Sequence, residues 1–287
     1  MPSLKSIRKR IVSVKNTQKI TKAMKMVAAA KLRRAQQKLM QSRLYGKTLE
    51  ELIHRLLASG QDLQHPLLNA VEQPKAAWVF AFTSDRGLCG GFNSNLLRRT
   101  DRFLRENKDL YAELLVQMRG RKGCEYYRAR KITLAAEYPG IAEKFDYATA
   151  GQFAERFMAA FTKGEADEVF IVYNQFKSAI SQDILVKKIL PVALSGDAPK
   201  TTGDILWEPD QFSLLDQLLT RYVAMQLYLA HLESQASELG ARMSAMDSAT
   251  NNASDMMDRL TLQMNRARQA AITTELMDIV NGAEAMK

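Results

Sequence analysis

Apolar residues recur in alternating steps of three and four along the last third of the chain. The pattern occupies seventeen successive positions from Leu215 to Ala271, sixteen of them apolar, and no proline follows Pro209. An unbroken seven-residue repeat predicts a helix that coils left-handedly around another helix. A helix over these positions is ~85 Å long at a rise of about 1.5 Å per residue. The sequence therefore predicts a long, stiff helical element.

The start of the chain carries the same spacing. A seam of sixteen positions begins at Leu4 and ends at Leu56, and eleven of its positions are apolar. Two helices that flank one central domain must run antiparallel if they pair with each other. We therefore expect residues 1–60 and 209–287 to form a long antiparallel coiled coil.

The seam of the first helix is interrupted at one place. Gln18, Thr21 and Lys25 occupy three successive seam positions there. The nearby apolar residues that lie off the register are Ile20, Met24 and Val27. The shift predicts a local drift of the apolar stripe around the helix.

The C-terminal helix is expected to be longer than its partner. If Leu56 lies opposite Leu215, then Leu4 lies opposite Ala267, and the residues beyond have no helix of the same chain to cover them. This last segment is apolar at Ile272, Leu276, Met277, Ile279 and Val280. Exposed apolar surface of this size usually marks an interface, although a frayed terminus is the alternative. We favour a partner protein at this end.

Residues 74–205 follow a different pattern. Short apolar runs predict strands buried on both faces at 76–82, 114–118 and 169–173, with a further edge strand at 184–190. The segments between them predict helices at 93–107, 121–130 and 151–163. This alternation predicts a Rossmann-like α/β domain, and about 130 residues suffice for one independent core. The predicted fold class is α/β, with the coiled coil of the two terminal helices added.

Charge is concentrated at one end of the chain. The whole sequence has 41 basic and 31 acidic residues, a net charge of +10, and residues 1–49 contain no acid at all. A solvated helical face normally includes acids as i,i+4 partners of its basic residues. The sequence therefore predicts a negatively charged partner, for which nucleic acid, anionic lipid and acidic protein loops all qualify.

The loop after the first strand is the main candidate for chemistry. Residues 83–93 are rich in glycine, and such strand-to-helix loops can bind phosphate, as residues 119–123 could after the second strand. Neither loop has the Gly-Lys-Ser/Thr ending or the GxGxxG spacing of a nucleotide site. Cys89 beside Arg86 could be a reactive thiol, whereas Asp85 is more consistent with a cap or an ion pair. We favour tight turns with helix capping over an anion site.

Other sites and locations are disfavoured by composition. The three histidines are scattered and predict neither a metal centre nor a catalytic triad, so we expect no catalytic residue, no metal and no cofactor. No apolar run approaches the ~20 residues that span a bilayer, and the basic start lacks the apolar core of a secretory signal. Two cysteines are too few for a disulfide framework, which fits a reducing cytoplasm.

Three segments resemble the signatures of one known family. Residues 6–31, 85–91 and 267–276 resemble the N-terminal, central-loop and C-terminal signatures of the gamma-subunit family of F-type ATP synthases. The resemblance covers both helices and the domain between them, in the family's order. It implies a non-catalytic central rotor shaft that couples rotation of the membrane c-ring to the catalytic beta subunits, and no nucleotide in its α/β domain. The implied partners are the alpha and beta subunits, the epsilon subunit and the c-ring.

The resemblance also implies particular functional positions. Contacts with beta or stabilisation of the shaft are implied for Lys9, Met24, Arg242, Arg268, Gln269, Thr273 and Glu275. Contacts at the foot, near the c-ring and epsilon, are implied for Trp207 and Glu208. Residues 121–123 depart from the Ser-Lys-Gly of the family, which leaves the role of the 119–123 loop open. Without a redox insertion or a transit peptide, the expected location is the cytoplasmic face of a bacterial inner membrane, as a peripheral protein.

Two other functions compete with this interpretation. A basic coiled-coil arm could bind nucleic acid through many phosphates, but the first helix has no aromatic residue before Tyr45 to stack on bases. A nucleotide-dependent enzyme with a coiled-coil appendage would need the phosphate motif that the domain lacks. We expect neither nucleic acid nor membrane insertion.

Overall fold

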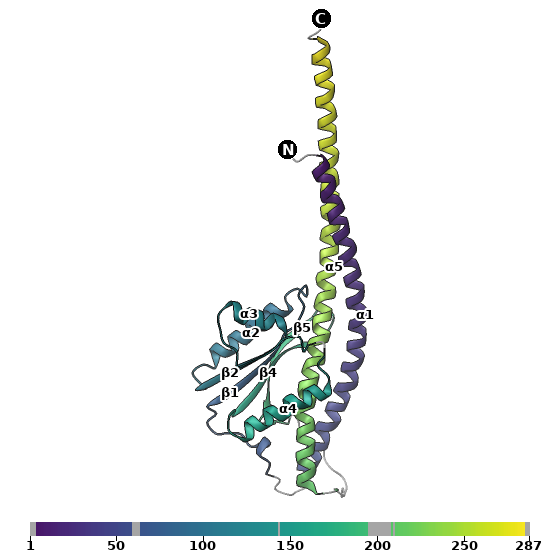
Figure 1. The fold of residues 1–287 in the computed structure, drawn as a ribbon. Coiled ribbons are helices and arrows are strands. Elements are labelled where there is room, and N and C mark those ends of the chain that lie inside the picture. Colours follow the sequence, from purple (N-terminus) through teal and green to yellow (C-terminus); the bar gives the residue numbers. More distant parts are fainter. Residues whose placement is uncertain (1–3, 59–63, 143, 195–207, 209, 285–287) are drawn as a thin grey trace. The chain divides into compact units, whose positions relative to one another are not determined.

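The computed structural model describes residues 4–58, 64–142, 144–194, 208 and 210–284 (Figure 1). Contacts along the chain define two compact units, a terminal unit of residues 1–29 with 242–287 and a central unit of residues 30–241. The long helices are α1 (Leu4–Leu57) and α5 (Gln211–Glu284), and both contribute to each unit. The other helices are η1 (Pro66–Leu68), α2 (Phe92–Glu106), α3 (Arg121–Ala129) and α4 (Tyr147–Thr162).

The central unit contains a five-stranded sheet. Its strands are β1 (Ala76–Phe82), β2 (Glu113–Arg119), β3 (Ala136–Tyr138), β4 (Glu168–Phe176) and β5 (Gln182–Leu190), in the order β3-β2-β1-β4-β5. The first four strands are parallel, and β5 joins the edge antiparallel to β4. Parallel strands with helical crossovers confirm the predicted Rossmann-like domain. Only β3 was absent from the sequence prediction, because three half-buried or exposed residues carry no apolar pattern.

Helices cover both faces of this sheet, as Figure 1 shows for the central unit. Trp78, Phe80 and Phe82 of β1 point to the face packed by α4, the start of α5 and the end of α1. Val79 and Ala81 point to the opposite face, packed by α2 and α3. Burial on both sides explains why β1 is a continuous apolar run rather than an alternating one.

The two long helices pair within each unit in the expected antiparallel register. In the central unit, Leu56 and Leu215 are fully buried in one apolar cluster. In the terminal unit, the hydroxyl oxygens of Thr21 and Thr250 lie 2.8 Å apart. Pairing Leu56 with Leu215 puts Thr21 opposite Thr250 in an antiparallel coil, so both units follow one register. The predicted coiled coil is confirmed.

The predicted drift of the apolar stripe on α1 is wrong. Thr21 is buried on the seam against Thr250, and Lys25 donates from Nζ to Asp247 Oδ1 at 2.5 Å. Ile20 and Val27, which the drift would have buried, are 60% and 56% exposed. The heptad therefore continues through the interruption with polar pairs, which satisfy one another across the seam and specify its register. Thr250 is the single polar seam position of α5, and it lies where α1 is polar too.

A cysteine pair tests this register directly. We expect Thr21→Cys with Thr250→Cys to form a disulfide on mild oxidation, because the two side chains already meet across the seam. Ile20→Cys with Thr250→Cys is the matched control, since Ile20 points to solvent. Loss of free thiols, measured after denaturation, reports the bond, and the native Cys89 and Cys124 are buried. Equal cross-linking of both pairs would instead support the predicted drift of the apolar stripe around α1.

Candidate functional site

The positions implied for partner contacts fall into separate groups on the helices. Arg268, Gln269, Thr273 and Glu275 are exposed on successive turns of α5, where Thr273 Oγ1 donates to the carbonyl of Gln269 at 2.9 Å. The remaining positions of the terminal unit are the exposed Lys9 and the half-buried Met24 and Arg242. Lys9 and Met24 lie ~22 Å apart along α1, so the structure does not gather these residues into one site. Glu208 is exposed, whereas Trp207 lies outside the described residues.

The end of α5 is apolar and exposed. Its outward apolar side chains in the described part are Ile272, Leu276, Met277, Ile279 and Val280, each about half exposed or more. Glu284 is the last residue of the helix, well beyond the positions that α1 can pair in this register. This exposed apolar end of α5 is the surface expected from the sequence.

The glycine-rich loop at 83–93 is a compact turn. The side chain of Asn93, in the first turn of α2, accepts from Ser84 N at 3.0 Å and donates to Ser84 Oγ at 2.8 Å. Cys89 is buried beside these groups and lies 3.3 Å from Asn93 Nδ2. The polar groups of the loop therefore bind one another, which fits the preferred interpretation of a tight turn with capping.

Asp85 links this loop to two others. Its Oδ1 accepts from the backbone N–H of Arg121 and of Gly140, both at 2.8 Å, and its Oδ2 accepts from Ala142 N at 3.1 Å. Arg121 is the first residue of α3, so Asp85 caps a helix N-terminus from a neighbouring loop. This agrees with the capping role expected for Asp85, and it fixes the position of the segment around Ala142.

A buried arginine lies at the carboxyl ends of the parallel strands. Arg119, the last residue of β2, is only 3% exposed, and its Nη2 donates to Ala142 O at 3.0 Å and to His231 Nδ1 at 2.7 Å. Its guanidinium carbon lies 5.2 Å from the ring centres of both Phe82 and Phe145. Burial lowers the pKa of Arg119 to about 10, although the nearby carboxylates of Glu238 and Asp85 act in the opposite direction and raise it. The guanidinium therefore stays charged at neutral pH.

His231 of α5 is held in its neutral form by these surroundings. Burial lowers its pKa well below the ordinary 6.5, and the positive charges of Arg119 and Lys38 lower it further. The aromatic rings of Phe145 and Tyr228 pack beside the imidazole, with ring centres 5.0 and 6.3 Å from its own. Because Nδ1 accepts from Arg119, the single ring proton lies on Nε2.

This depressed pKa predicts a dependence of stability on acid. The unfolded chain takes up a proton at this residue near pH 6.5 and the folded chain does not, so stability is full above that value and falls as the pH drops below it. One such group removes about 1.4 kcal/mol between about pH 7.5 and about pH 5.5. Urea unfolding at both values checks this. His231→Gln, which keeps an acceptor but cannot titrate, should reduce the difference by that amount, and an unchanged difference would contradict the assignment.

Glu233 makes a second polar junction two residues further along α5. Its Oε1 accepts from Arg43 Nε at 3.0 Å and from Arg43 Nη2 at 2.8 Å, and its Oε2 accepts from Phe176 N at 2.7 Å. Arg43 Nη2 also donates to Phe176 O at 3.1 Å. Glu233 therefore joins α5 to α1 and to the end of β4 at one point.

Sequence reasoning did not identify this polar face of α5. The buried polar residues of the helix are Gln226, His231, Glu233, Ser234 and Ser237, all outside the heptad seam. The available signal was a second apolar face, formed by Leu219, Val223 and Leu227. Together with the seam, this face makes the apolar surface of α5 broader than a simple two-stranded coiled coil needs. A helix that is apolar on two faces must pack on something besides its coiled-coil partner, and here that is the sheet.

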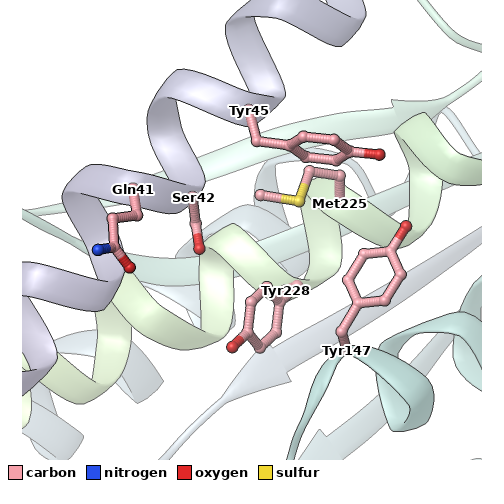
Figure 2. Close-up of a pocket in the computed structure, with 6 residues that line it drawn as sticks. All are labelled: Gln41, Ser42, Tyr45, Tyr147, Met225 and Tyr228. Carbon is pink, nitrogen blue, oxygen red and sulfur yellow. The ribbon is translucent and has the colours of Figure 1, made fainter.

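An open pocket lies where α1, α4 and α5 meet in the central unit (Figure 2). Its volume is about 330 Å³, and its lining residues are Gln41, Ser42, Tyr45, Tyr147, Met225 and Tyr228. The lining is aromatic and amide-bearing, and it contains no carboxylate, imidazole or thiol. In the described part of the chain, no group of His, Cys, Asp or Glu residues could hold a metal ion. Within the same residues, no helix is long and apolar enough to cross a membrane.

Known proteins match the chain over its whole length. Residues 3–286 match the family model described as ATP synthase. The ATP synthase gamma chain of Anaeromyxobacter sp. (strain Fw109-5) is 50% identical over 291 residues, and that of Geobacter metallireducens is 48% identical over 288 residues. In both alignments, 100% of each chain is covered.

Solved structures are similar too. A chain of the Tetrahymena thermophila mitochondrial ATP synthase, from a structure of the central stalk and c-ring, is 29% identical with a TM-score of 0.59, over 80% of this chain and 99% of that one. A chain from the rotor of the Euglena gracilis mitochondrial ATP synthase shares the fold at 21% identity, with a TM-score of 0.65 over 94% of this chain and 98% of that one. With its paired terminal helices, its Rossmann-like domain and this full-length likeness, the chain belongs to the ATP synthase gamma chain family.

Proposed function

We propose that this chain is the central rotor shaft of a proton-translocating F-type ATP synthase. The paired helices turn inside a ring of alpha and beta subunits, and the α/β domain binds the epsilon subunit and the c-ring. Rotation of the c-ring turns the shaft, and the asymmetric shaft drives the catalytic beta sites through different conformations. Membership of the gamma chain family supports this role, as does likeness to chains of a central stalk and of a rotor.

The observation that carries the proposal is the exposed apolar end of α5. A helix end with this much apolar surface is poorly suited to water. A surrounding sleeve of partner subunits would cover it, and apolar contact is non-directional, so the end can turn inside the sleeve without breaking specific bonds. The same feature is hard to reconcile with an independent soluble enzyme.

The partner contacts follow from this placement. Arg268, Gln269, Thr273 and Glu275 present exposed polar groups beside the apolar end, where beta subunits would surround it. Lys9, Met24 and Arg242 contact beta or stabilise the shaft, and the basic exposed face of α1 is complementary to acidic loops of beta. Trp207 and Glu208 belong to the foot, near epsilon and the c-ring.

The shaft has a mechanical role at the membrane surface. The shaft itself is non-catalytic and binds no cofactor, since ATP is made and hydrolysed in the beta subunits. The complex lies at the cytoplasmic face of a bacterial inner membrane, and this subunit is held there peripherally by the c-ring. Neither nucleic acid nor a lipid-inserted segment has a part in this function.

Purification of the complex tests the proposal. The chain is tagged, membranes are solubilised gently, and the co-purifying proteins are identified and assayed for ATP hydrolysis. We expect alpha, beta, epsilon and c subunits together with ATPase activity. Recovery of nucleic acid from the soluble fraction, without ATPase subunits, would contradict the rotor assignment.

A further inference from the structure

α5 contacts the sheet through two kinds of interaction. Leu219, Val223 and Leu227 bury an apolar face, and a separate group of polar side chains lies between His231 and Ser237. We propose that Arg119, through its bond to His231, is a positioning residue that prevents α5 from turning about its own axis against the sheet. Arg119 thereby transmits torque from the α/β domain to the helix, an inference that rests on the proposed rotor function.

Arg119 buries its guanidinium at a cost in free energy. Arg119 is almost wholly enclosed, and its Nε has no hydrogen-bond partner among the described residues. The carboxylates of Glu238 and Asp85 attract its charge, but its Nη2 donates to a carbonyl and an imidazole. Burial of a charge without a direct counter-charge is expensive, and an apolar side chain of similar volume often serves stability as well or better. A purely structural role therefore explains this arginine poorly.

The guanidinium of Arg119 is fixed from three sides. Phe82 ends β1, and Phe145 precedes α4, so that the two rings are contributed by different segments beside the sheet. The carbonyl of Ala142 accepts from Nη2, and Asp85 holds the N–H of Ala142. The donor that meets His231 is thus rigidly placed by the domain rather than by α5.

The hydrogen bond between Arg119 and His231 is directional, whereas the apolar contacts of α5 are not. Apolar packing has no preferred orientation, so the apolar face of α5 alone would allow the helix to roll or slide. A hydrogen bond weakens steeply as its angle departs from linear. The 2.7 Å bond from Arg119 to His231 Nδ1 therefore fixes the rotation of α5 where it leaves the sheet.

Neighbouring contacts also hold α5 in place against the sheet. Ser234 Oγ accepts from Asn174 N at 3.4 Å, and Ser237 Oγ donates to Asn174 O at 3.2 Å. A Cβ added to Gly240 would lie 2.8 Å from the carbonyl oxygen of Ala179, so the helix backbone approaches the β4–β5 turn closely. Arg119 is the member of this junction that comes from β2, on the other side of the central strand from β4.

The test separates torque transmission from folding. Arg119→Met removes the donor and keeps the volume, and Arg121→Met removes an exposed arginine two residues away as the matched control. We expect the melting temperature of the isolated Arg119→Met chain to fall by no more than a few degrees, because two buried acceptors lose their donor while a desolvated charge is removed as well. In everted membrane vesicles carrying the complete complex, we expect ATP hydrolysis to continue. The number of protons pumped per ATP hydrolysed should fall at least about twofold, because loss of a hydrogen bond from a charged group lowers the population of the fixed helix orientation on the order of tenfold.

A second pair of variants keeps the result interpretable. His231→Gln retains an acceptor for Arg119 and should keep most of the pumping per ATP, whereas His231→Leu should lose it as Arg119→Met does. The Arg121→Met vesicles should match wild type.

The outcomes distinguish this inference from the proposed function. Wild-type vesicles that hydrolyse ATP and pump protons uphold the rotor assignment whatever the variants do. If Arg119→Met and His231→Leu then pump as wild type does, the positioning role is overturned. A large fall in melting temperature, with pumping per ATP unchanged in the complexes that assemble, would equally overturn it and make Arg119 a structural residue.

Discussion

Replacing Gly120 by alanine should remove about 4 kcal/mol or more from the free energy of unfolding, since severe overlap adds to backbone strain. Gly120 has φ of 100°, a conformation that side chains of L-residues rarely adopt. A Cβ there would lie 2.2 Å from the carbonyl oxygen of Thr83 and 2.6 Å from its carbonyl carbon. Both atoms belong to the backbone of the residue that directly follows β1, so neither can move aside without shifting the end of the strand.

Gly140→Ala is the matched control for this variant. Gly140 also has a positive φ, of 80°, but nothing lies within 4 Å of its added Cβ. Its cost should be limited to backbone strain, about 1–2 kcal/mol. Urea unfolding of the full chain, followed by circular dichroism, compares the two variants. Equal losses of unfolding free energy in the two variants would mean that the β2–α3 turn does not pack tightly against the end of β1.

The second large effect is expected on the coiled-coil seam of the central unit. Leu39 of α1 is 2% exposed, and its neighbour Met40 is 71% exposed. Leu39→Ala removes a buried side chain and leaves a cavity, so it should cost about 3 kcal/mol. Met40→Ala removes a side chain of similar size from the same helix and should change stability by less than about 0.5 kcal/mol.

Thermal and urea unfolding of the two variants measure this difference. The contrast isolates packing on the seam, because both substitutions introduce the same residue into adjacent positions of one helix. A loss for Met40→Ala as large as that for Leu39→Ala would place the seam on the wrong face of α1.

The sequence was sufficient for the parts of the fold that rest on periodicity. The heptad from Leu215 onward predicted α5 and its pairing with α1, and the apolar runs at 76–82 and 169–173 predicted central strands. These elements are recognisable because one physical constraint, burial along a stripe or on both faces of a strand, repeats over many residues. β3 has only three residues and no such repeat.

Partner-dependent features were harder to predict. Thr21 and Lys25 interrupt the apolar pattern of α1. Their partners, Thr250 and Asp247, lie on the opposite helix, so the sequence of α1 alone does not reveal them. Likewise, nothing local to His231 indicates that the donor of its hydrogen bond lies 112 residues earlier in the chain. Both interactions depend on which residues meet in the folded chain. The periodicity of one segment gives no information about these long-range partners.

The contact positions remain predictions of another kind. Arg268, Gln269, Thr273 and Glu275 are exposed, as residues that meet another subunit must be, but exposure alone does not identify a partner. Their assignment comes from the family resemblance, while the exposed apolar end beside them comes from the pattern of the chain itself.

Direct observation of rotation tests whether this chain is the rotor shaft. A bead is attached to the α/β domain of this chain through a cysteine introduced at an exposed position such as Lys108, in a complex immobilised through its beta subunits. If the chain is the rotor shaft, the bead should turn in one direction when ATP is added and stop when ATP is removed. An immobilised complex that hydrolyses ATP at its normal rate while beads on this chain stay still would show that the chain is not the rotor shaft.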